Sequence, residues 1–397
     1  MGSTKVEFNP FQPEVMVDPY PYYRRMREAD PVHWNGTLRA WFLTRHADVL
    51  ELLKDDAFSA DRSRSDRFRP PPPGREARGR SMLVSDPPHH TRLRNLVNTA
   101  FTPRMTERMR PRIEAIAADL LDSVARRREL DLVADFAYPL PVVVIAEMLG
   151  VPTRDRGRFQ EWSATLVRGL DPILDDATQE AVLDARDALI DYLRDVVADH
   201  RAEPRDDLMS ALIVAEERGD TLSENELLTM CNLLLVAGHE TTVNLIGNGV
   251  LTLLRHPDQL ERLRAHPGLA RTAVEELLRY TSPVQWTGRV PLREIELGGR
   301  TLLPGQSVVG VLGAANRDPA VFAEPDRLDL GRDPNPHVAF GRGIHFCLGA
   351  PLARLEAQVA LPMLLQRFPG LRLAGEPEPR PTLVLRGLSR LPVALSA

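Results

Sequence analysis

The stretch that decides the fold of this 397-residue chain reads Phe340-Gly-Arg-Gly-Ile-His-Phe-Cys-Leu-Gly349. It surrounds Cys347 with Gly341, Gly343 and Gly349, which predict tight backbone turns that can approach a flat ligand closely. The segment that follows has the spacing of an amphipathic helix, so Cys347 lies just before a helix N-terminus. Backbone N–H groups and the helix dipole stabilise a negative sulfur there. The pattern therefore favours a thiolate metal ligand over an inert buried cysteine.

This decapeptide resembles the haem-binding signature of the cytochrome P450 superfamily, Phe-Gly-x-Gly-x-His-x-Cys-x-Gly, at every fixed position. The resemblance implies that Cys347 is the proximal ligand of the iron in haem b. A thiolate in that position favours cleavage of the O–O bond in bound dioxygen. The resemblance also implies that Phe340, Gly341 and Gly349 shape the haem-binding loop and that His345 hydrogen-bonds a haem propionate.

A long helix is predicted upstream of the cysteine. Ser223 and Glu226 form a capping-box pattern that marks a helix start, and the apolar run can continue to about Leu254, ahead of Pro257. A membrane span is excluded because polar and charged residues interrupt the run well inside the length that a span requires. We therefore expect a long helix that crosses the molecule.

Midway along this helix, the stretch Ala237-Gly-His-Glu-Thr-Thr242 resembles the oxygen-binding motif of the same superfamily. The resemblance implies that Gly238 leaves room for dioxygen and that Thr241 hydrogen-bonds the oxygen and steers protons to it. Glu240 would begin the proton relay from solvent. The pair His-Glu also begins a zinc-protease motif, but Val243 replaces the second histidine, which excludes that interpretation.

Other residues are expected to anchor the haem or the loop beneath it. His90 and Arg94 are four residues apart, so on a helix they face the same group. The resemblance assigns both of them, and Arg289, to the haem propionates. It also pairs Glu276-Leu-Leu-Arg279 with Arg327 in a buried ion network, whereas without the resemblance a solvated surface pair would be the better interpretation.

Composition excludes several classes of protein. The net charge of −5 argues against a nucleic-acid-binding face. The only cysteines are Cys231 and Cys347, so no disulfide framework is expected and a reducing cytoplasm is favoured. Residues 1–10 contain no apolar run typical of a signal peptide or membrane anchor. We expect a cytoplasmic protein that acts as a monomer.

The overall pattern predicts a mainly α fold with small β-sheets (α+β), in which the long central helix crosses the haem. The spacing of apolar residues indicates helices over 107–124, 140–149, 159–168 and 179–200, and short strands after residue 282. Residues 61–81, with four consecutive prolines, are expected to form an exposed, mobile loop. A single catalytic domain, 1–397, is expected, with no fused reductase.

The implied function is a monooxygenase that uses dioxygen to hydroxylate or epoxidise a lipophilic small molecule of secondary metabolism, such as antibiotic biosynthesis. Electrons would come from a separate ferredoxin with its ferredoxin reductase, or from a flavodoxin. Residues 61–81 contain seven arginines and three acids, a surplus of four positive charges, which favours a carboxylated or carrier-protein-tethered substrate. An arginine-rich solvated face is the plainer interpretation.

Two other functions remain as alternatives. A peroxide-driven peroxygenase would use the same cofactor, but Glu240 and Thr241 disfavour it because their relay serves dioxygen. A non-catalytic haem protein, acting as a sensor or a recruitment scaffold, would not need Thr241. Residues around 162–171, 234–237, 284–286 and 388 are expected to line the substrate pocket together with the 61–81 loop.

Overall fold

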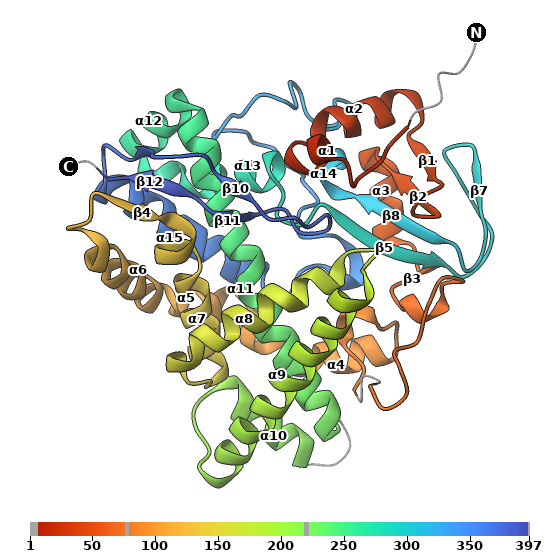
Figure 1. The fold of residues 1–397 in the computed structure, drawn as a ribbon, viewed down its shortest axis with the longest axis horizontal. Coiled ribbons are helices and arrows are strands. Elements are labelled where there is room, and N and C mark those ends of the chain that lie inside the picture. The colour runs from red at the N-terminus through yellow and green to blue at the C-terminus, as the bar shows by residue number, and fades with distance from the viewer. Residues whose placement is uncertain (1–6, 76–78, 218–221, 396–397) are drawn as a thin grey trace.

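The computed structural model describes residues 7–75, 79–217 and 222–395. Its central element is helix α11 (Glu224–Arg255), which crosses the molecule behind α8 and α9 in Figure 1. The predicted capping box is present, since the Ser223 hydroxyl accepts from the Glu226 N–H and the Glu226 carboxylate accepts from the Ser223 N–H. The long central helix is thus confirmed.

The other helices pack around α11 and mostly in the half of the molecule away from the larger sheet (Figure 1). In chain order they are α1 (Pro13–Val17), α2 (Tyr20–Ala29), α3 (His46–Lys54), α4 (His89–Val97), α5 (Pro103–Arg108), α6 (Arg110–Val124), α7 (Pro139–Leu149), α8 (Arg156–Leu166), α9 (Asp176–Ala202), α10 (Leu208–Glu217), α12 (Pro257–Ala265), α13 (Ala270–Tyr280), α14 (Leu312–Ala315) and α15 (Ala350–Arg367).

The strands form small sheets. The largest has the order β1-β2-β8-β5-β3, with β2 and β8 parallel and the other pairs antiparallel. Of the three shorter sheets, one has β12 between β4 and β9, one pairs β6 with β7, and one pairs β10 with β11. The bounds are β1 (Val32–Asn35), β2 (Ala40–Leu43), β3 (Phe58–Ser59), β4 (Glu129–Asp131), β5 (Trp286–Pro291), β6 (Ile295–Leu297), β7 (Arg300–Leu302), β8 (Ser307–Val311), β9 (Arg372–Leu373), β10 (Glu378–Pro379), β11 (Leu388–Arg390) and β12 (Pro392–Ala394).

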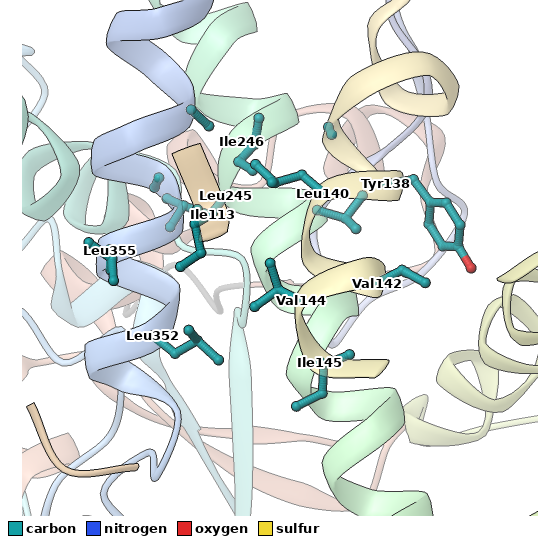
Figure 2. Packing of buried hydrophobic residues seen from close by; sticks show 14 of the residues in the cluster. Ile113, Tyr138, Leu140, Val142, Val144, Ile145, Leu245, Ile246, Leu352 and Leu355 are labelled. Carbon is teal, nitrogen blue, oxygen red and sulfur yellow. The ribbon is translucent and has the colours of Figure 1, made fainter. Parts of the chain in front are cut away.

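The main core fills the space between α11 and the helices around it. Figure 2 shows Leu140 and Val144 of α7 directed toward α11, with Leu352 and Leu355 on α15 nearby. All four side chains are buried. Burying a side chain of this size contributes roughly 1.5–3 kcal/mol. This packing holds α11 and α15 in place; α11 carries residues 237–242, and α15 begins directly after the cysteine loop.

The predicted helices are found with one difference. The run predicted over 107–124 is divided between α5 and α6, which meet at Met109. Pro111 stands in the first turn of α6, where its missing N–H costs nothing, whereas a continuous helix would set its ring against the carbonyl of residue 107. Proline therefore breaks a helix that the apolar spacing alone makes continuous.

The predicted 61–81 loop has no helix or strand beyond one short 3₁₀ turn at Arg62–Arg64 in its described part. Most of its described residues are exposed, as predicted. Glu76 and Arg78, which entered the charge count, lie outside the described residues. No helix in the described ranges combines the length and the apolar character that crossing a membrane requires.

Candidate active site

The cysteine loop folds tightly ahead of α15. The Cys347 N–H donates to the carbonyl of Phe340 at 2.9 Å, closing the loop on itself. Gly341 and Gly343 have φ of +69° and +71°, in the left-handed region that favours glycine. A Cβ on Gly343 would also lie 2.4 Å from the Leu53 carbonyl oxygen. These two glycines therefore form the tight turns that the sequence predicts.

Gly349 differs from that prediction. Its φ of −80° is open to any residue, so no special turn requires glycine here. A Cβ added to it would meet no atom within 4 Å, and the residue borders a cavity. Glycine at this position therefore leaves the cavity wall free of a side chain.

The same cavity is lined by the cysteine loop and by α11, and its volume is about 290 Å³. Cys347, Phe340 and Gly341 line it from the loop, and Gly238 and Thr241 line it from α11. The fold thus brings together two motifs that are far apart in the sequence.

The position of Cys347 before helix α15 is not sufficient to make its thiol a thiolate. Burial raises its pKa, and the backbone N–H groups of Gly349 and Ala350 and the charges of Arg94 and Arg354 oppose that effect only in part. The predicted helix-terminus stabilisation exists but is smaller than the cost of burial. A coordinated metal ion would deprotonate such a thiol.

A cluster of basic side chains borders the cavity beside Cys347. His90, Arg94, Arg289 and His345 all line it, and the His90 and His345 rings lie 4.2 Å apart between their centroids. Burial lowers the pKa of His345 to about 3, and the charge of Arg289 adds to the effect. Among the described residues, the buried Nδ1 of His90 has no hydrogen-bond partner. The cluster therefore fits an anionic group such as the two propionates of a haem.

Two of these side chains also contact the protein itself. Arg94 donates to the carbonyls of Ile344 and Phe346 at 2.9 and 2.7 Å, which ties α4 to the cysteine loop. Burial lowers the pKa of Arg289 to about 10, and the charge of Arg62 contributes. None of the described acids lies within 4 Å of the Arg289 guanidinium.

Gly238 lets α11 pack closely against α7. A Cβ at this position would lie 2.8 Å from Cγ1 of Ile145, which projects from α7 toward α11 in Figure 2. The Thr241 hydroxyl donates to the Ala237 carbonyl at 3.3 Å, one helical turn earlier. Thr241 lines the cavity, so its hydroxyl is available to a ligand there.

Glu240 is buried and forms an ion pair with Arg380, and neither residue lines this cavity. Burial would raise its pKa, but hydrogen bonds and charges from His239 and Arg380 outweigh burial and lower the pKa to about 2. Glu240 is therefore a carboxylate without direct contact to solvent. Arg380 lines a different cavity of about 430 Å³, which the sequence analysis did not foresee.

A further cavity, of about 320 Å³, lies between the 61–81 loop, the large sheet and residues 170–172. Arg289 lines both this cavity and the one beside Cys347, so the two adjoin at that side chain. Arg62, Arg67 and Arg69 face it from the loop. The half-buried acid Asp171 also lines it, with its carboxylate bound by the N–H groups of residues 383 and 384.

The arginines of the loop are not equivalent. Arg75 forms ion pairs with three acids of α9, and Arg64 lies 3.7 Å from Asp86. Arg67 donates to the Leu38 carbonyl. Arg62 has no acid within 4 Å among the described residues. The surplus charge expected from the sequence is therefore partly neutralised and is concentrated at the cavity.

The predicted pocket segments are distributed over the three cavities. Leu234, Ala237 and Val284 line the cavity beside Cys347. The loop and residues 170–171 line the adjoining cavity instead, and Leu388 lines the third. The sequence analysis missed Met82, Phe101 and Leu312, which also line the first cavity and are ordinary apolar residues in the sequence.

The buried ion network is present, but one predicted member is wrong. Glu276 and Arg279 are fully buried and joined by two hydrogen bonds of 2.7 and 2.8 Å. The Arg327 side chain is exposed and pairs with Glu324, and only its carbonyl accepts from Arg279. Arg332 takes the predicted place, because the chain turns back after residue 329 and brings this later guanidinium to Glu276.

Comparison with known proteins agrees with this arrangement. The family model for cytochrome P450 matches residues 24–266 and 268–392. Cytochrome P450 107B1 of Saccharopolyspora erythraea is 49% identical over 94% of this chain and 93% of its own. The polyketide biosynthesis cytochrome P450 PksS of Bacillus subtilis is 41% identical over 99% of both chains.

Among solved structures, P450BioI in complex with a hexadec-9Z-enoic acid-ligated acyl carrier protein superposes with a TM-score of 0.91. It is 40% identical, and the match covers 96% of this chain and all of that one. The family implies a haem-thiolate cofactor, and the basic cluster beside Cys347 fits one. The chain therefore belongs to the cytochrome P450 family and is an oxidoreductase of the monooxygenase class.

Proposed function

We propose that this protein, acting through residues 1–397 as one catalytic domain, hydroxylates or epoxidises a lipophilic small molecule of secondary metabolism. One atom of dioxygen enters the substrate and the other leaves as water, while two electrons and two protons are consumed. The observation that carries the proposal is the shared cavity in which Cys347 and the basic cluster meet Gly238 and Thr241 of α11.

Haem b is the proposed cofactor, with Cys347 as its iron ligand. When bound, it supplies the redox chemistry that activates dioxygen. His90, Arg94, Arg289 and His345 line this cavity together and would hold the two propionates of the haem. Gly349, with open space where a Cβ would stand, leaves the cavity free for a flat ring.

Two side chains of α11 are proposed to manage protons. The Thr241 hydroxyl, on the cavity wall, would hydrogen-bond the oxygen substrate and deliver a proton to it. Glu240, one residue earlier and outside the cavity lining, would resupply that proton. Because Arg380 and His239 hold it as a carboxylate, it must loosen from one of them to accept a proton.

The adjoining cavity supports an amphipathic acid as the substrate, either free or tethered to a carrier protein. Its walls include Phe42, Val308 and Val290, and Arg62 adds a cation with no acid within 4 Å among the described residues. P450BioI was solved with an acyl group on an acyl carrier protein, and PksS is named for polyketide biosynthesis. Both relatives support a long-chain or polyketide-like acid.

Electrons are proposed to come from a separate ferredoxin with its reductase, or from a flavodoxin.

The test of the proposed cofactor is the spectrum of the reduced protein under carbon monoxide, which should show the red-shifted Soret band of thiolate ligation. Cys347→Ala should abolish that band. A normal thiolate spectrum in this variant would remove Cys347 from its assigned role.

The test of the proposed reaction uses isotopically labelled dioxygen with a ferredoxin, its reductase and a library of acyl and polyketide acids. Substrates are first selected by their effect on the iron spin state. Label in the product supports monooxygenation. Label that enters only from hydrogen peroxide would indicate a peroxygenase, and binding without any product would indicate a non-catalytic haem protein.

A further inference from the structure

A row of polar side chains runs along α11 from Glu240 toward the C-terminal end of the helix. Glu240, Asn244 and Asn248 follow one another at intervals of four residues, so they lie on the same face of α11. All three side chains are buried. In the other direction, the residue four positions before Glu240 is the apolar Val236, which interrupts the row. The row therefore leads away from Glu240 on one side only.

The row ends at the cavity of about 430 Å³ that Arg380 lines. Asn248 lines this cavity as well, whereas Glu240 and Asn244 do not. The exposed Arg255 is also part of its wall, which indicates that the cavity opens to solvent. Arg380 pairs with Glu240 from the cavity wall. Asn244 therefore stands between the buried acid and a space that water can enter.

The Asn244 side chain has an unusual environment. The residue is only 1% exposed, and neither the oxygen nor the nitrogen of its amide has a hydrogen-bond partner among the described residues. Buried amides nearly always have partners, and an internal water supplies them where no protein group does. Gly387 faces this amide, since a Cβ there would collide with the amide oxygen. Two polar atoms are thus left for a buried water to satisfy.

The spacing of the row suits contacts through water. Side chains four residues apart on a helix have their Cβ atoms about 5–6 Å apart. Between short side chains this separation is too long for a direct hydrogen bond, but one water can bond to both groups. A water on the Asn244 amide can therefore reach the Glu240 carboxylate on one side and the cavity at Asn248 on the other.

We propose that Asn244 holds buried water that connects Glu240 to the cavity lined by Asn248, and that protons enter the relay by this route. Each proton that passes from Glu240 toward Thr241 is replaced by one from the water on Asn244, which in turn takes a proton from the water of the cavity. The route requires no movement of a helix. The proposal rests on the proposed function, since Asn244 is a positioning residue for the same relay.

The water is tested directly in a high-resolution crystal structure of the haem-loaded protein. We expect ordered water within hydrogen-bond distance of the Asn244 amide and further water between it and the cavity. In Asn244→Leu, which keeps a side chain of similar size that binds no water, the first water should be absent. A dry amide, or one bonded only to protein groups, would overturn the proposal whether or not any substrate is turned over.

The route is tested by the use of electrons and by the solvent isotope effect. In Asn244→Leu we expect the ratio of released peroxide to product to rise about five-fold, the factor by which losing a typical hydrogen bond shifts an equilibrium. The solvent deuterium isotope effect on product formation should also rise, because the supply of protons becomes slower. A purely structural role would leave this isotope effect unchanged. Asn244→Ser, whose hydroxyl binds water, should bring both values back toward those of the wild type.

Asn232→Leu is the matched control on α11. The Asn232 amide oxygen is also buried without a partner among the described residues, and Val236 separates it from Glu240. Gly387→Ala is an independent perturbation, because its Cβ would displace the Asn244 amide without changing its chemistry. We expect no effect in the control and a higher peroxide ratio in Gly387→Ala, which also decides the question if Asn244→Leu does not fold.

The outcomes separate the two proposals. An unchanged peroxide ratio and isotope effect in Asn244→Leu or Gly387→Ala, in enzyme that forms product, would overturn the route and leave the monooxygenase intact. An equal increase in Asn232→Leu would also overturn it, because it would point to a general effect on α11. Absence of product in the wild type would contradict the proposed function, while the crystal structure would still decide whether Asn244 holds water.

Discussion

The guanidinium of Arg332 lies against the buried carboxylate of Glu276, with its Nε 3.1 Å from Oε2, although 56 residues separate the two. The same carboxylate also accepts from Arg279, from the Asp329 N–H at 3.0 Å and from the Asn335 amide at 3.1 Å. Glu276 on α13 therefore holds the irregular chain that leads to the cysteine loop.

The first prediction concerns this network. Glu276→Ala should lower the free energy of unfolding by about 3–5 kcal/mol, because it leaves the fully buried Arg279 unpaired. Arg332→Ala should cost less but still be measurable, and Arg327→Ala should have little effect because its ion pair is exposed. Urea unfolding and haem content measure the three variants. An equal loss in Arg327→Ala and Arg332→Ala would contradict this arrangement.

The predicted and the observed members of this ion network show which contacts can be predicted from a sequence. Glu276 and Arg279 are three residues apart on a helix, so their contact follows from helical geometry. The third member comes from an irregular segment, where no periodicity fixes the direction of a side chain. Arg327 and Arg332 both carry the right charge, and only the turn after residue 329 decides between them.

In the candidate active site, too, local motifs were predicted and contacts between distant elements were not. The cysteine loop and the start of α11 follow from local sequence patterns. The capping box predicts where α11 begins, and two glycines of the loop, both with positive φ, predict its turns. Arg380 was not predicted as the partner of Glu240, because it reaches the acid across 140 residues. The contact of His239 on α11 with the Ser163 hydroxyl on α8, at 3.0 Å, likewise depends on how the two helices pack. Contacts between elements require the assembled core.

The second prediction concerns pH. Burial alone would raise the pKa of Glu275, but hydrogen bonds from His337 and Arg354 outweigh it and lower the pKa to about 2. A depressed carboxyl pKa contributes stability that is complete above the unfolded value and is lost as pH falls. Relative to Glu275→Gln, the wild type should be about 3 kcal/mol more stable at neutral pH. That advantage should disappear between about pH 4.5 and 2.

Denaturant unfolding from neutral to acid pH measures this difference. Glu378→Gln is the control, since the Glu378–Arg390 pair is exposed and should contribute little at any pH. A stability difference for Glu275→Gln that is constant over the acid range would show that the carboxylate is not held by its two partners.

The third prediction concerns glycines of α11. Gly238→Ala should destabilise the protein by roughly 1–3 kcal/mol, because its Cβ would lie 2.8 Å from Ile145 in a packed core. Gly247→Ala should instead be stabilising by about 0.5–1 kcal/mol, since its Cβ meets only Val133 at 3.8 Å and alanine favours the helix. Thermal unfolding compares the two. Stabilisation by both substitutions would refute the packing role of Gly238.

The fourth prediction tests the hydroxyl of Thr241. Thr241→Ala should bind substrate with nearly unchanged affinity but release more peroxide per electron pair, because the cavity loses the donor proposed to deliver protons. Thr252→Ala is the control on the same helix, where the hydroxyl faces Thr281 in another part of the molecule. Unchanged product per reducing equivalent in Thr241→Ala would exclude the assigned role.

The last prediction concerns the charge of the substrate. Arg62 lines the cavity that adjoins the one beside Cys347, and no described acid lies within 4 Å of it, whereas Arg64 is close to Asp86. Arg62→Gln should weaken binding of the free or carrier-tethered acid about two- to five-fold, as expected for one partly exposed charge pair. Affinity for the neutral ester should not change.

Arg64→Gln serves as the matched control and should leave the affinity for the acid nearly unchanged, since its charge is already balanced. The difference between wild type and Arg62→Gln should also shrink as salt is added, because exposed charges are screened over about 8–10 Å at physiological ionic strength. Spin-state titrations of acid, ester and carrier-bound forms at two salt concentrations supply these numbers. Equal losses for acid and ester would mean that Arg62 contributes shape and not charge, and the substrate would then be chosen by its apolar part alone.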